Sequence, residues 1–559
     1  MRTPHASRDF DTPKPPAPHG FRESMDWVHT WSGLLFGVLL FAIFFMGTLS
    51  CFDREIDRWA QPASRSGAGG VERAALDAAL PHLRELADPR ATNWLIYPPS
   101  ERVPSLRIGW SGGGMELQVR DLDPATGALR PQQGGAIGTR FMFPMHFSLH
   151  WKRLDLGYWL VGAAGMAMLV GIVSGVATHR RILKDFFTFR PGKPLQRSAL
   201  DLHNWTAVLA LPFHFAIALS GLVIFFGIYM KAGIFAAYGS EAEDRARFNR
   251  EAFSSYTRPL AKQPLQTIAP LEAMVTQAQR RWSARGEPGE PGLVIVRNPR
   301  DANAVVDVRR AYRNRVSLTA DTVWFGAADG RVLHEERMPA ATKVQRWISG
   351  LHFIQFDHWP LRWLYFAMGA AGCAMLLTGT LVWCEKRRAR HARHGRLGAT
   401  IVEAINVAGT VGLIVATLAM LCANRLLPAG LADPLGLEMR VFFGVWIATL
   451  LHALVVAFVD GRTPARRHWA QQCAAVALLA LAAVVLNAAT TGDHLLKTLG
   501  SGMGAVAGVD LGLLATAGLA ACVVQRLRRP TVPSSRRTAA PEERGAPAEA
   551  SSPTGAAAP

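Results

Sequence analysis

The sequence has few charged residues for its length: Asp, Glu, Lys and Arg make up 18% of the 559 residues, whereas 50% are hydrophobic. The apolar residues are gathered in runs of about 20, and uncharged runs of that length are typical of membrane-spanning helices. For most of the chain, these runs therefore exclude the soluble, fibrous and disordered classes of protein.

Cysteine is also scarce, with six residues and no C-x-x-C or other metal spacing. The cysteines lie singly at or inside apolar runs, at Cys51, Cys373, Cys384, Cys422, Cys473 and Cys522. This distribution argues against a disulfide framework and a zinc site. Walker A and H-E-x-x-H elements are absent, so nucleotide-binding and metalloprotease functions gain no support.

Basic residues outnumber acidic ones, which gives a formal net charge of +19. In a soluble chain this excess would suggest nucleic acid. Here it falls mainly beside the ends of apolar runs, where it reports orientation in a membrane. The expected partner is therefore the lipid bilayer and not a nucleic acid.

Eight apolar runs predict eight transmembrane helices. They cover residues 27–51, 157–178, 203–230, 362–384, 402–423, 437–459, 469–489 and 503–525. The loops 179–201 and 385–400 are rich in Arg and Lys, which places them in the cytoplasm by the positive-inside rule. The predicted fold class is a polytopic α-helical membrane protein with both termini cytoplasmic.

This topology divides the chain into units. They are a disordered N-terminus (1–20), transmembrane helix 1 (21–51), a first extracytoplasmic segment (52–156), helices 2 and 3 with a basic loop (157–230), a second extracytoplasmic segment (231–361), helix 4 (362–384), helices 5 to 8 (402–525) and a disordered tail (530–559).

The two long extracytoplasmic segments carry short β-like runs separated by turn residues. In the first segment the runs are 106–110 and 115–119, followed by a turn at 123–127; in the second they are 293–296, 304–308, 316–319 and 322–325, before a turn at 329–330. Such patterns predict small α+β modules, one in each segment.

The first four predicted spans read as two copies of one unit. His29-Thr-Trp opens span one and His203-Asn-Trp opens span three, and a glycine follows each histidine 18 residues later, at Gly47 and Gly221. Spans two and four share GAAGMAML (162–169) and GAAGCAML (369–376), at an offset of 207. The pattern predicts an internal duplication, and cofactor or substrate sites tend to lie between such repeats.

Seven histidines gather at the ends or inside these spans. His29, His179 and His203 lie at the predicted inner ends, His146, His150 and His352 lie near the outer ends, and His214 lies deep in span three. His203 and His214 are 11 residues apart. On one straight helix they would share a face within about 20°, roughly 16 Å apart along the axis.

A single histidine at a helix end is usually an interfacial residue, but several at two membrane levels predict axial ligands of haem iron. Symmetry favours His29 with His203 at an inner site, with His179 as an alternative to His29. The outer site draws on His214, His352, His146 or His150. His452 and Asp510, polar groups inside later spans, are either packing residues or part of a proton route.

Several of these motifs together resemble the PepSY-associated transmembrane helix family, over about residues 20–390. They are His29-Thr-Trp, the turn at 123–127, MHFSLHW (145–151), THRRI (178–182), DLHNW (201–205), LPFH (211–214) and LHF (351–353). The resemblance implies a PepSY-type fold for each outer segment and a place in the bacterial inner membrane. It also implies a link to haem-containing ferric-siderophore reductases.

These inferences predict an oxidoreductase that uses haem b, two per chain, to pass electrons across the membrane to a ferric siderophore or other ferric chelate. The electron donor would be a cytoplasmic reductant or a quinol. No side chain is expected to act as a catalytic acid or base. The alternatives are a transporter in which the repeat gives alternating access and histidines relay protons, and a sensor or assembly protein whose outer modules bind peptides.

Overall fold

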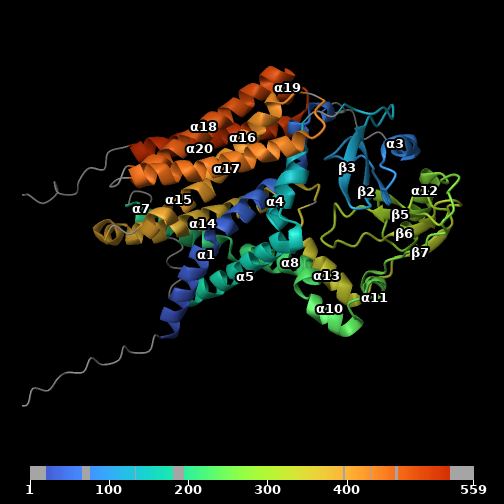
Figure 1. The fold of residues 1–559 in the computed structure, drawn as a ribbon, viewed down its shortest axis with the longest axis horizontal. Coiled ribbons are helices and arrows are strands. Elements are labelled where there is room, and N and C mark those ends of the chain that lie inside the picture. Colours follow the sequence, from blue (N-terminus) through green and yellow to red (C-terminus); the bar gives the residue numbers. More distant parts are fainter. Residues whose placement is uncertain are drawn as a thin grey trace, which may run out of the picture.

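The computed structural model describes residues 20–65, 76–131, 134–179, 190, 194–354, 356–394, 397–428, 430–459 and 464–528. Long helices lie side by side, and one β-sheet stands at one end of them (Figure 1). The predicted disordered segments 1–20 and 530–559 fall outside the described residues, apart from Gly20, and so does most of the basic loop 179–201.

The elements follow the chain in three groups. The first group comprises α1 (Phe21–Ser50), α2 (Asp53–Ala60), η1 (Pro62–Ser64), η2 (Leu76–Ala78), α3 (Ala79–Leu86), β1 (Asn93–Tyr97), β2 (Leu106–Gly112), β3 (Met115–Leu122), η3 (Gly138–Met142), α4 (Phe143–Ser148), η4 (Arg153–Asp155) and α5 (Leu156–Thr178). The second comprises α7 (Leu195–Leu209), α8 (Leu211–Ile224), α9 (Phe226–Tyr229), α10 (Lys231–Tyr238), α11 (Ala242–Phe253), α12 (Leu271–Ala284), β4 (Pro291–Arg297), β5 (Val305–Arg310), β6 (Val323–Gly326), β7 (Val332–Glu335), α13 (Ala340–Gly350) and α14 (Trp359–His394). The third comprises α15 (Leu397–Val407), η5 (Ala408–Gly412), α16 (Leu413–Leu426), α17 (Pro434–Val459), α18 (Pro464–Thr491), α19 (Leu495–Gly500) and α20 (Gly504–Arg528).

Seven helices in the described part of the chain are long and apolar enough to cross a membrane, and the bent pair α7 and α8 brings the number to eight if it counts as one span. They match the predicted runs. The third predicted span is the exception, because it bends by 67° between α7 and α8. Pro212, at the start of α8, has no N–H to donate and its ring clashes with the carbonyl four residues back. The expectation that His203 and His214 share one straight face is therefore wrong.

The spanning helices form two packed groups. In one, α1 lies between α5 and α14, and α7 packs along α14. In the other, α16 packs against α17 and α18, and α18 packs against α20 (Figure 1). A buried apolar cluster joins the groups, with Phe41 and Met46 of α1 and Phe141 beside Met420 of α16 and Phe442 of α17.

Strands from both long segments form one sheet of seven strands in the order β3-β2-β1-β4-β5-β6-β7. The two segments meet where β1 pairs with β4 in antiparallel register, with Trp94 opposite Val296. The predicted separate modules thus share a continuous sheet. The run 316–319 is not a strand, and the patterns missed β1 and β7. Both predicted turns are present, with Gly127 and Gly330 at positive φ.

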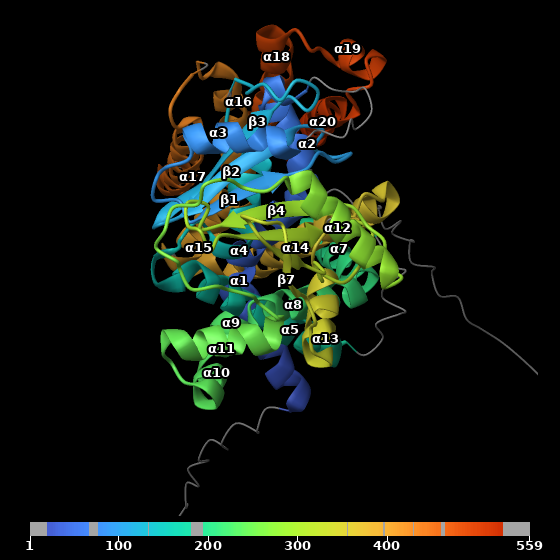
Figure 2. The same ribbon diagram turned by 90° about the vertical axis from the view of Figure 1, so that its right-hand side faces the viewer.

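Helices α3 and α12 cover one face of the sheet (Figure 2). Leu83 of α3 and Trp282 of α12 pack with Ile96, Ile108 and Val296 of the sheet, and along β1 the buried Trp94 and Ile96 alternate with more exposed neighbours. This alternation buries one face of β1, as expected for a sheet covered by helices.

A buried cluster of charges ties the sheet segment to the spanning helices. Arg102, in the loop between β1 and β2, contacts Glu55 of α2 at 2.7 Å and Asp53 at 3.0 Å. Arg362 of α14 contacts the same Glu55 at 2.8 Å and donates to the carbonyl of Cys51 at the end of α1. Burial alone would raise the pKa of Glu55, but the two guanidinium groups lower the pKa below its ordinary value of 4.5.

We predict that Glu55→Gln lowers the free energy of unfolding by about 3–5 kcal/mol, because it leaves two buried guanidinium groups without their shared carboxylate. Since the folded protein lowers this pKa, the stabilisation is present above pH 4.5 and is lost as the pH falls below it. Thermal unfolding of the detergent-solubilised protein at several pH values measures both effects.

The matched control is Glu116→Gln, which removes an exposed partner of Lys152. It should change stability by less than about 1 kcal/mol. Equal effects of the two substitutions would contradict the role given to the Glu55 cluster.

Candidate functional site

Four of the seven predicted histidines form two pairs. The rings of His29 in α1 and His203 in α7 lie 6.2 Å apart between centroids. The rings of His146 in α4 and His352, just after α13, lie 5.7 Å apart, and their Nε2 atoms approach to 3.4 Å. We call these the α1–α7 pair and the α4–α13 pair.

Each of the four rings is held through its Nδ1 by a backbone carbonyl. His29 donates to Gly171 of α5 at 2.9 Å, and His203 donates to Met375 of α14 at 2.8 Å. His146 donates to Ile43 of α1 at 2.8 Å and His352 to Ile217 of α8 at 2.9 Å. A carbonyl only accepts, so each Nδ1 carries the proton and the Nε2 of a neutral ring keeps its lone pair.

A glycine lies under each ring, four residues after the accepting carbonyl. These glycines are Gly175, Gly379, Gly47 and Gly221. A Cβ at Gly47 would meet the His146 ring at 2.7 Å, and one at Gly221 would meet the His352 ring at 2.9 Å. Residues four apart share a helix face, so the carbonyl and the glycine together form a seat for an imidazole.

The α4–α13 pair lines a cavity of about 540 Å³ between α1, α4, α5 and α8. Its walls are mostly apolar, with Phe44, Gly165 and Leu222 among them, and Arg54 of α2 and Arg102 also line it. A mostly apolar chamber with a few polar groups is typical of a site for an organic cofactor. In the described part of the chain, no cluster of three or more His, Cys, Asp or Glu side chains is placed to hold a bare metal ion.

The α4–α13 histidines are partly buried and lie outside the spanning helices. Burial lowers the pKa of His146, and burial together with the neighbouring His146 ring lowers the pKa of His352 to about 4. Both imidazoles are therefore neutral at pH 7. Because both protons are on Nδ1, the 3.4 Å contact sets two Nε2 lone pairs against each other. Such an arrangement is suited to two ligands of one metal ion.

The other three predicted histidines stand outside these pairs. The buried His214 donates from Nε2 to the carbonyl of Met368 at 3.2 Å and packs edge-on against Phe44. His150 donates from Nε2 to the carbonyl of Phe141 and stacks on that ring. His179 ends α5, four residues after Gly175.

The two polar groups of the later spans have packing partners. Asp510 accepts from the indole of Trp59 at 2.8 Å and from Asn487 at 3.2 Å. His452 contacts Gln471 at 3.1 Å. These contacts account for both residues as parts of the helix packing.

The sequence patterns did not identify the four glycines beside the rings or the two arginines that line the cavity. Gly47 and Gly221 mark the repeat in the sequence, and their constant spacing from His29 and His203 is the signal that could identify them. Arg54 comes from α2 and Arg102 from the loop between β1 and β2, and no local motif surrounds them.

Together the helices and the sheet define a polytopic α-helical membrane protein with a substantial β-domain outside its spans. Residues 27–386 match the model of the family described as the PepSY-associated TM region. The chain belongs to that family, and the match spans both histidine pairs and all seven strands.

One curated protein also shows local similarity. It is the leptomycin B resistance protein pmd1 of Schizosaccharomyces pombe, 31% identical over 113 residues. The match covers 20% of this chain and 7% of the length of that protein.

We predict that Gly47→Ala destabilises the protein by about 1–3 kcal/mol, because the added methyl group overlaps the His146 ring and forces it from its carbonyl. Gly33→Ala on the same helix is the matched control, since a Cβ there meets no atom within 4 Å. Thermal unfolding should show a lower midpoint for Gly47→Ala alone. An unchanged midpoint for Gly47→Ala would show that the ring is free to move.

Proposed function

We propose that this protein is a haem b oxidoreductase of the bacterial inner membrane that passes electrons across the bilayer to reduce a ferric chelate, such as a ferric siderophore. The observation that carries the proposal is the α4–α13 pair, in which two partly buried, neutral imidazoles turn their Nε2 lone pairs toward each other. Two imidazole ligands leave most of an iron coordination sphere to a macrocycle, as in bis-histidine haem sites.

The chain fits such a group on three counts. The Nδ1 donation to a carbonyl fixes the tautomer and orients the ring, the usual outer-shell arrangement for a metal-binding histidine. Gly47 and Gly221 leave space beside the two rings. The cavity has apolar walls for a macrocycle, and Arg54, one of its few basic lining residues, makes no ion pair within the described part of the chain.

The α1–α7 pair supplies a second site of the same construction. Ile43, which accepts from His146, follows His29 by 14 positions on α1, and Ile217 follows His203 by 14 positions on α7 and α8. Along α1 this spacing amounts to roughly 21 Å. Two sites at the two ends of one spanning helix are suited to carrying electrons across the membrane.

The repeated seats also support the internal duplication. Ser174-Gly175 under His29 corresponds to Thr378-Gly379 under His203 at an offset of 204, three residues short of the 207 of the GAAG segments. The hydroxyl groups of Ser174 and Thr378 make the same local contact, because each donates to the carbonyl four residues before it. In such a duplication each copy supplies one histidine to each pair.

In this proposal the bound haem supplies one-electron exchange, while the chain fixes its ligands, excludes water and presents a docking surface. The ferric ion gains one electron and becomes Fe(II), which hard oxygen ligands hold less tightly. A quinol or a cytoplasmic reductant is oxidised in turn. The proposal places the sheet outside the cytoplasm, beside the α4–α13 pair, and both termini inside.

A transporter is the second candidate, and the 67° bend between α7 and α8 favours it. Broken spans are common where transporters bind their substrates. In that alternative the histidine pairs relay protons, and the protein has no chromophore.

Visible spectra of the purified, oxidised and dithionite-reduced protein separate the two. We expect a b-type spectrum with about two haems per chain, because two pairs offer two bis-histidine sites. His203→Ala and His352→Ala should each lose about half of the haem, and His29→Ala and His146→Ala should match them.

The matched control is His82→Ala in the sheet domain, whose ring bonds to the carbonyl of Gly127. Substitution of His214, His150 or His179 is expected to keep the wild-type haem content, since each lies outside the pairs. A colourless protein, made in cells with ample haem, would exclude the oxidoreductase and favour the transporter.

A further inference from the structure

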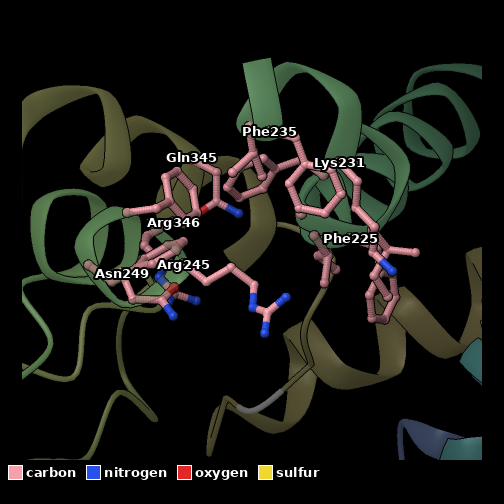
Figure 3. A pocket seen from close by; sticks show the side chains of 14 residues that line it. Phe225, Lys231, Phe235, Arg245, Asn249, Gln345 and Arg346 are labelled. Carbon is pink, nitrogen blue, oxygen red and sulfur yellow. The ribbon is translucent and has the colours of Figure 1, made fainter. Parts of the chain in front are cut away.

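A second cavity, of about 510 Å³, opens where the third span ends. Its walls come from the end of α8, from α9, α10 and α11, and from α13 (Figure 3). It shares only Ile224 and Phe225 with the cavity that the α4–α13 pair lines. Its other residues play no part in the proposed electron path.

The cavity combines aromatic walls with positive charge. Phe235, Phe248 and Phe253 supply apolar surface, and three cations face the same space. In Figure 3, Arg245 and Arg346 lie on one side of the cavity and Lys231 on the other. No Asp or Glu is among the described residues that line it.

The two arginines make no ion pair with the described part of the chain. Within the described chain, neither Arg245 nor Arg346 has a carboxylate within ion-pair distance; Arg245 donates to the carbonyl of Ser240, and Arg346 lies over the ring of Phe253 at 5.1 Å. Arg346 is half-buried, and its Nε atom is buried without a partner. A partly buried cation with an unmet N–H donor favours an anionic ligand.

Large apolar side chains also lie on the protein surface beside the cavity. Met230, Val344 and Trp347 are 63%, 59% and 51% exposed, although all three are large hydrophobic side chains. They flank the cavity at the end of a spanning segment, where aromatic and apolar side chains commonly enter the membrane interface. The ligand that reaches this cavity would therefore come from the lipid phase.

We propose that this cavity binds an anionic phospholipid, with its phosphodiester between Arg245 and Arg346 and an acyl chain along the phenylalanine walls. An arginine binds a phosphate group by charge-assisted hydrogen bonds, and the apolar walls suit an acyl chain. Inorganic phosphate would satisfy the arginines and leave the apolar walls bare, whereas a zwitterionic lipid would bring a choline cation beside Lys231. The cavity thus matches the charge and the apolar part of one ligand class.

The test is native mass spectrometry of the full-length protein, stripped of lipid in detergent and titrated with dioleoylphosphatidylglycerol. We expect one retained phosphatidylglycerol that dioleoylphosphatidylcholine and inorganic phosphate do not displace. Arg245→Gln and Arg346→Gln should each weaken its binding roughly fivefold, at about 1 kcal/mol for each basic residue near a lipid phosphate.

Arg250→Gln is the matched control, because Arg250 is an exposed arginine of α11 that does not line the cavity. It should bind phosphatidylglycerol as the wild type does. Arg245 is exposed, so its variant keeps the test valid if Arg346→Gln fails to fold. Equal retention of the two lipids, displacement by inorganic phosphate, or unchanged binding by Arg245→Gln would overturn the proposal.

Discussion

The arrangement of the histidines depends on one contact made four times: an imidazole Nδ1 donates to a helix carbonyl, and the residue four positions on is glycine. A helix presents residues four apart on one face, so the carbonyl orients the ring and the missing side chain makes room for it. The contact also fixes the tautomer. It leaves each Nε2 lone pair directed away from the helix that holds the ring, and in the α4–α13 pair two such lone pairs converge at 3.4 Å.

The rest of the architecture keeps these contacts in register. Helix α1 takes part in both pairs, because it carries His29 and also supplies the carbonyl of Ile43. Its end is fixed by the charge cluster in which Glu55 holds Arg102 of the sheet segment and Arg362 of α14. Arg102 also lines the cavity that contains the α4–α13 pair. Packing of the sheet, orientation of α1 and geometry of the cavity are therefore coupled, and the C-terminal helices support α1 from the other side.

Sequence patterns predicted the spans well, since a run of about 20 apolar residues has few alternatives to a membrane helix. Of the seven histidines that the sequence singles out, four lie in the two pairs. The patterns did not predict the bend at Ala210, although Pro212 was a signal for it, because proline is tolerated in many spanning helices. They did not predict that the two outer segments share one sheet. The pairing of β1 with β4 joins residues about 200 positions apart, and no local pattern encodes such a contact. Likewise, the partners of His214 and His150 are backbone carbonyls on neighbouring elements, which periodicity cannot identify.

The central claim is that the paired histidines carry electrons through the membrane, and vectorial reduction in proteoliposomes tests it most directly. Dithionite would be sealed inside vesicles that contain the protein, ferric citrate would be added outside, and Fe(II) would be followed with a ferrous-specific dye. The account predicts external Fe(II) with the wild-type protein and only the background of empty vesicles with a His203→Ala, His352→Ala double variant. Background reduction with a wild-type protein that retains its haem would contradict the account.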